Sequence, residues 1–198
     1  MEKSGIPEKL TKPAKWIGLG CFAVILLAVL LFMFLNVIHV DDGNNQNAGP
    51  DFTGWMISFY YFGRQLIYNR YFFGFNAALA LGSVFAVLAI VVSLCMIRKS
   101  GKLRTAVLFL IVAVFALWAG IAYLNAFGLA ESTASQEMWQ RFDTVASETS
   151  TYAITVVSFV LCLISSLELA AEGGLLIATH IRSKKRGDDV GAAEKKKK

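Results

Sequence analysis

The sequence predicts an all-α integral membrane protein: a four-transmembrane-helix bundle with cytoplasmic N and C termini and a short amphipathic interfacial helix in the first outer loop. Three observations predict this fold. Hydrophobic residues make up 56% of the 198 residues and the mean hydropathy is +0.57, which is more apolar surface than a water-soluble domain of this size can bury. Four apolar runs are long enough to cross a bilayer. The basic residues cluster on one side of these runs.

The four apolar runs define the expected spans. A membrane-crossing helix needs about 20 mostly apolar residues, because the hydrocarbon is about 30 Å thick and each helical residue rises about 1.5 Å. Continuous apolar runs indicate helices, since transmembrane β-strands alternate apolar and polar residues. We therefore expect one membrane domain over residues 1–198. Its spans cover about 16–38, 72–97, 105–127 and 152–180, and a basic tail follows at 182–198.

The positions of the basic residues predict the orientation of the bundle. Four lie in residues 1–15, four in 98–104 and eight in 182–198, which is 16 of the 19 Lys and Arg residues. The other three, Arg64, Arg70 and Arg141, lie in the two remaining loops together with seven acids. The positive-inside rule then places both termini and the 98–104 turn in the cytoplasm. We expect the plasma or cytoplasmic membrane, or the endoplasmic reticulum in a eukaryote, where the terminal Lys195 to Lys198 has the form of a di-lysine retrieval signal.

The same charge distribution predicts the partners. A basic cluster beside a span attracts anionic lipid, at about 1 kcal/mol per Lys or Arg. The net charge of +5 is therefore interpreted as a topology signal, and no nucleic acid partner is expected, because a basic soluble domain is missing.

No catalytic, cofactor or metal motif is evident in the sequence. The two histidines, His39 and His180, are expected at opposite surfaces of the membrane and could not share a metal ion. Without a histidine at a comparable depth, a serine nucleophile has no base. We expect no cofactor, and we do not expect an enzyme.

The first outer loop contains an aromatic-rich segment. Apolar residues recur at helical spacing from Phe52 through Trp55 to Phe59, and Tyr60 follows, which predicts a short amphipathic helix in the outer headgroup layer. An interfacial aromatic belt is the simpler interpretation, because Trp and Tyr favour that depth. An aromatic platform that binds a ligand or partner is the alternative.

Two spans carry small residues at every fourth position. Because helices in lipid associate through close backbone approach at small residues, each stripe predicts a helix-packing face. The second span provides Gly74, Ala78, Gly82 and Ala86; the fourth provides Ser158, Cys162, Ser166, Ala170, Gly174 and Ala178.

Glu168 and Glu172 are the acids inside a predicted span, and their spacing of four places them on one helical face. A carboxylate at depth costs a few kcal/mol, so such residues are candidates for an ion or contact site. The alternative is that both side chains reach the cytoplasmic headgroups near Arg182 and Lys184.

Four spans with both termini inside and a longer first outer loop resemble the layout of claudin-like and MARVEL-type proteins. The claudin first loop carries a Trp-Gly-Leu-Trp signature and a cysteine pair, whereas residues 39–71 contain Trp55 and no cysteine. The resemblance therefore covers topology and implies no role for individual residues.

These observations favour a non-enzymatic tetraspan protein that acts as a structural or accessory subunit through helix–helix packing, as a homo-oligomer or with another membrane protein. A small oligomeric transporter or channel that uses Glu168 and Glu172 is the alternative.

Overall fold

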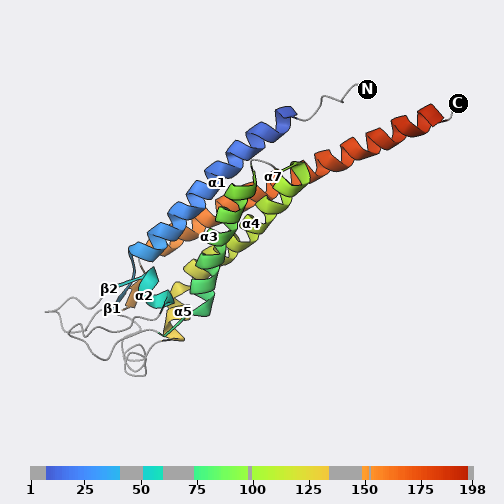
Figure 1. The fold of residues 1–198 in the computed structure, drawn as a ribbon. Helices are drawn as coiled ribbons and strands as arrows, with labels where there is room; N and C mark the ends of the chain where they lie inside the picture. The colour runs from blue at the N-terminus through green and yellow to red at the C-terminus, as the bar shows by residue number, and fades with distance from the viewer. Residues whose placement is uncertain are drawn as a thin grey trace.

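The computed structural model describes residues 8–40, 51–59, 74–97, 100–133, 149–151 and 153–195. Among these residues, four helices are long and apolar enough to cross a membrane. They are α1 (Glu8–Phe34), α3 (Ala77–Ile97), α4 (Lys102–Leu124) and α7 (Ala153–Lys195). The protein is therefore a bundle of apolar helices, as the composition predicts (Figure 1).

Helix α4 lies at the centre of the bundle. Its most extensive contacts are with α7 and α3, while α1 packs mainly on α7. Both termini lie at the same end of the bundle (Figure 1). At that end the Lys15 ammonium group donates a hydrogen bond of 3.3 Å to the Ser100 carbonyl oxygen, which ties α1 to the turn between α3 and α4.

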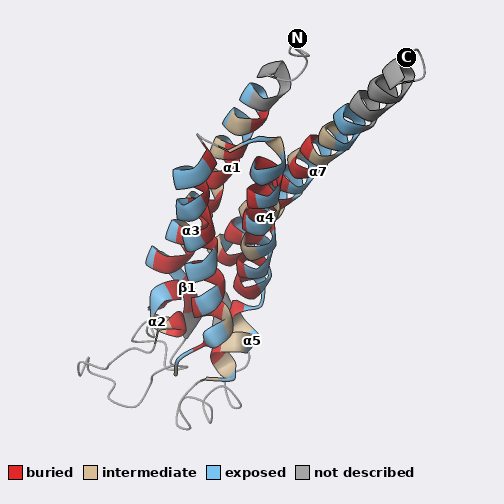
Figure 2. Cartoon of the chain, turned by 45° about the vertical axis from the view of Figure 1, so that its right-hand side comes forward, coloured by how far each residue is buried: buried red, intermediate tan, exposed pale blue. Residues whose placement is uncertain are grey.

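Aromatic side chains fill the contact between α1 and α4. The Phe22 and Phe109 rings meet edge to face, with centroids 6.0 Å apart, and Phe32 stacks on Tyr123 at 3.9 Å. Figure 2 shows the buried residues on the inner faces of the helices and exposed residues on the outer faces. The outer faces are themselves apolar, since Val114 and Leu167 are more than 60% exposed, which is the surface expected of helices that contact lipid.

A small antiparallel sheet covers the end of the bundle opposite the termini. Its strands are β1 (Asn36–Val40), β2 (Asp51–Thr53) and β3 (Thr149–Thr151), in the order β2-β1-β3. The all-α prediction is wrong at this point, and the first span ends earlier than expected, because residues 36–38 belong to β1. Val37 and Ile38 are fully buried. These apolar residues therefore pack within the folded chain as part of the sheet and do not extend the first span.

The aromatic segment of the first outer loop is only partly helical. Helix α2 (Gly54–Ser58) has five residues and begins at Thr53, whose hydroxyl accepts a hydrogen bond from the Met56 amide. Phe52 precedes the helix in β2 and is buried, whereas Trp55 is 53% exposed and packs on Phe59 with ring centroids 4.5 Å apart. The predicted helix is thus shorter than expected at its start, and Tyr60 lies outside the described residues.

Short helix α5 (Ala126–Glu131) follows α4 and joins α3 to this end of the bundle. The Asn76 side chain donates to the Leu129 carbonyl oxygen at 2.6 Å and accepts from the Leu79 amide at 3.2 Å. Asn76 is buried, so it connects the first turn of α3 to α5 while satisfying its own polar atoms.

Candidate functional site

The small residues of the second span lie on the contact between α3 and α4. Gly82 and Ala86 are buried, and a Cβ atom at Gly82 would lie 3.3 Å from the Cα atom of Ala119 in α4. Gly74 precedes α3 and contributes differently: its amide donates to the Thr133 carbonyl oxygen at 2.6 Å. Ala78 is half-buried. Close backbone approach therefore occurs at Gly82 and Ala119.

The first half of the α7 stripe packs against α4. Ser158, Cys162 and Ser166 are buried. A Cβ atom at Gly120 of α4 would lie 2.9 Å from the Cβ atom of Cys162, closer than such atoms normally approach. Only a glycine at position 120 permits this contact. The Ala116-Gly120 pair in the third span is the sequence signal for it, although a single pair is a weak indication.

The second half of the stripe does not pack against the described part of the chain. Ala170, Gly174 and Ala178 are exposed, and a Cβ atom at Gly174 would have no described heavy atom within 4 Å. Gly173 makes the contact instead, since its Cβ atom would lie 3.2 Å from the Ala106 carbonyl oxygen and 3.2 Å from Leu110 Cγ. A spacing of four residues drifts around a helix of 3.6 residues per turn, so the stripe rotates away from α4 along its length.

These two contacts fix the depth of Glu168. Gly173 lies opposite Ala106 and Leu110 near the start of α4, and Cys162 lies opposite Gly120 near its end. Glu168 is five residues from Gly173 and six from Cys162, or about 7.5 and 9 Å along the helix. It is therefore level with the middle of α4.

The side chains around Glu168 belong to an apolar surface. Glu168 is exposed and Glu172 is half-buried, and both lie near Cys21 of α1, which packs mainly on α7. Both residues are therefore on the side of α7 that faces α1. Ile164, which lies one turn before Glu168, is 60% exposed, and Leu167, the residue directly before Glu168, is 63% exposed. An acid in this setting can hold a proton, a cation or a polar group of another helix.

Several hydroxyl groups inside the bundle are not evident as a set in the sequence. Ser83 Oγ lies 2.8 Å from the Tyr123 hydroxyl, between α3 and α4. Ser93 Oγ and Ser158 Oγ are buried and have no hydrogen-bond partner within the described ranges. Among the residues that the structure describes, no group of three or more His, Cys, Asp or Glu side chains could hold a metal ion.

No protein-family model, characterised protein sequence or solved structure matches the chain.

Proposed function

We propose that the chain is a non-enzymatic tetraspan membrane protein that acts as a structural or accessory subunit through helix–helix packing. The partner is a second copy or another membrane protein, and the contact is the face of α7 around Glu168. One observation carries this proposal: Glu168 is exposed at a depth level with the middle of α4. An ionised carboxylate that faces lipid at this depth costs a few kcal/mol, and a polar partner removes that cost.

Exposed residues of α7 on the same face as Glu168 support the same interpretation. Ala171, three residues after Glu168, is exposed, and a small residue permits close approach of a further helix. The large apolar neighbours Ile164 and Leu167 offer contact area on the same helix.

Photo-crosslinking in native membranes tests this contact. A benzoylphenylalanine at Ile164 should form a protein adduct, because that side chain lies one turn before Glu168 on the same face of α7 and is 60% exposed. The matched control is Val91 of α3, which is 48% exposed on an outer face and should yield no protein adduct. Equal adduct formation at Ile164 and Val91, or none at either, contradicts the proposal.

A small oligomeric transporter or channel is the second candidate, favoured by the shared face of Glu168 and Glu172 beside Cys21. A single four-helix chain rarely encloses a pore, so this function requires several copies. Flux measured in reconstituted vesicles should then be lost in Glu168→Gln while the fold is retained. Vesicles without measurable flux for Na⁺, K⁺ or protons count against this candidate.

We also infer the orientation of the protein. The basic residues at the end of the bundle that carries the termini support a cytoplasmic location of that end in the plasma or cytoplasmic membrane, with anionic lipid near the tail. At the opposite end Trp55 is exposed and packs on Phe59, and an exposed Trp at this end supports a position in the outer headgroup layer.

A further inference from the structure

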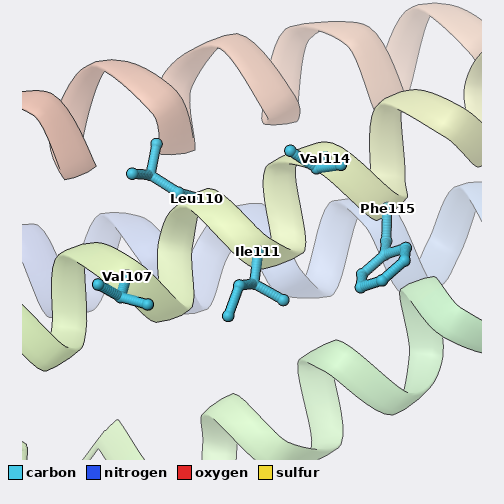
Figure 3. Close-up of a pocket in the computed structure, with 5 residues that line it drawn as sticks. All are labelled: Val107, Leu110, Ile111, Val114 and Phe115. Carbon is cyan, nitrogen blue, oxygen red and sulfur yellow. The ribbon is translucent and has the colours of Figure 1, made fainter.

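An apolar groove runs along the outer face of α4. Figure 3 shows the groove between α3 and α7, on the side of α4 that faces away from α1. Its volume is about 320 Å³, at the lower end of the roughly 300–1,000 Å³ range of small-molecule sites. The side chains that line it contain only carbon: Val107, Leu110, Ile111, Val114 and Phe115. Its occupant must therefore be apolar.

The length of the groove matches one leaflet of a bilayer. From Val107 to Phe115 the helix rises about 12 Å, and half of the hydrocarbon thickness is about 15 Å. The groove begins near the first turns of α4 and ends near its middle. There Phe115, the last lining residue, packs against Phe85 of α3 at 5.4 Å and against Trp118 at 6.4 Å between ring centroids. A spanning helix of another protein would need a groove through both leaflets, so the geometry favours an acyl chain.

The residues of α7 that border the groove have small side chains. Leu110 contacts Gly173, and at about 100° per residue Ala170 and Gly174 lie on one side of Gly173, while Glu172 lies on the other. Since Glu172 is on the α1 side, Ala170 and Gly174 border the groove. Neither has a side chain larger than a methyl group, so the space beside Leu110 stays open.

A basic side chain stands at the mouth of the groove. Arg104 is exposed, and its spacing of three to Val107 and seven to Ile111 places it on the groove face of α4. Helical side chains tilt toward the N-terminus, so the guanidinium group points toward the membrane surface. Helix α4 contains no Asp or Glu, and the two acids within the spanning part of α7 lie on its opposite side. A lipid phosphate is the group that an arginine at this position binds best.

We propose that this groove and Arg104 together bind one anionic phospholipid from the leaflet at the termini end of the bundle. One acyl chain occupies the groove from Val107 to Phe115, and Arg104 binds the phosphate. This site is separate from the basic tail of α7, and it does not depend on the helix contact at Glu168.

Native mass spectrometry of the full chain in detergent tests the site. The probes are phosphatidylglycerol and phosphatidylcholine with identical acyl chains, and the measured quantity is the apparent Kd of the first bound lipid. Arg104→Gln should weaken binding of phosphatidylglycerol about fivefold and binding of phosphatidylcholine less, because the choline cation of that lipid offsets the charge of its phosphate, while Arg104→Lys keeps the preference. Val114→Trp should fill the groove and weaken binding of both lipids. Because Val114 is 64% exposed, this change does not disturb the core.

Two control variants distinguish binding in the groove from binding at the basic tail or on the outer face of α3. Arg182→Gln removes a basic residue of α7 beyond the groove, and Val91→Trp adds the same ring to the outer face of α3; neither should alter the first Kd. The proposal is wrong if Arg182→Gln, and not Arg104→Gln, removes the preference for phosphatidylglycerol. It is also wrong if Val114→Trp changes the oligomeric state and leaves both lipid affinities intact, which would identify the groove as a contact between copies.

Discussion

Leucine substitutions at the adjacent residues Gly173 and Gly174 should affect stability very differently. At Gly173 a Cβ atom alone would lie 3.2 Å from the Ala106 carbonyl oxygen and 3.2 Å from Leu110 Cγ, already inside ordinary contact distance. A leucine adds three further carbons, so α4 and α7 must separate or Leu110 must move. Such overpacking costs about 1–3 kcal/mol.

The Gly174→Leu variant is a matched control. Both variants gain the same helix propensity, because they replace adjacent glycines of one helix by the same residue. At Gly174 no heavy atom lies within 4 Å of the Cβ position, so we expect a change within about 0.5 kcal/mol. The difference between the two variants therefore isolates the packing term, about 1–3 kcal/mol.

The free energy of unfolding in mixed micelles, from titration with sodium dodecyl sulfate, measures this difference. Leu110→Ala combined with Gly173→Leu should recover part of the loss, because it removes the side chain that the new leucine meets. Equal losses in the two single variants would refute the assignment of Gly173 to the contact. A larger loss of stability in Gly174→Leu would indicate that Gly174 packs against a helix, as the four-residue spacing predicts.

Three further predictions concern other parts of the chain. Ser83→Ala should cost about 1–2 kcal/mol, and more than Tyr123→Phe, because it leaves the buried Tyr123 hydroxyl unpaired; in Tyr123→Phe the serine still donates to the Leu79 carbonyl oxygen. Equal costs in the same titration would argue against this. Glu168→Gln should leave the free energy of unfolding unchanged or raise it slightly, since a neutral amide is less costly in lipid, and a large loss would reveal a bound carboxylate. Ser100→Cys, in a Cys95→Ser background, should not react with membrane-impermeant maleimides on intact cells. Labelling from outside would show that the orientation is the opposite of the one inferred.

The number and approximate position of the spanning helices are predictable from the sequence, whereas the faces through which they pack are not. Helix α3 is apolar around its whole circumference, so hydropathy does not distinguish the side that meets α4 from the side that meets lipid. The four-residue spacing includes Gly82 and Cys162, which lie where α3 and α7 approach α4. The same spacing also includes Gly174, because spacing in the sequence does not indicate where a neighbouring helix ends or how the small-residue face rotates around α7.

The small sheet was not predictable from hydropathy for a related reason. Val37 and Ile38 extend the apolar run of α1 with little interruption, and a buried strand and a buried helix end look alike over so few residues. Their partners in β2 and β3 are distant in sequence, so only the folded chain brings the pairing residues together. The depth of Glu168 is likewise set by two contacts with α4, and a span boundary estimated from composition does not supply it.

The length of α7 has a mechanical consequence. The helix is continuous over 43 residues, about 65 Å at the usual rise, and extends past the ends of its neighbours (Figure 1). A rod without a proline or a break transmits torque as well as tension. A load applied near Lys195 therefore reaches the bundle first at the Gly173 contact, and the packed part of α7 from Gly173 back to Cys162 resists it.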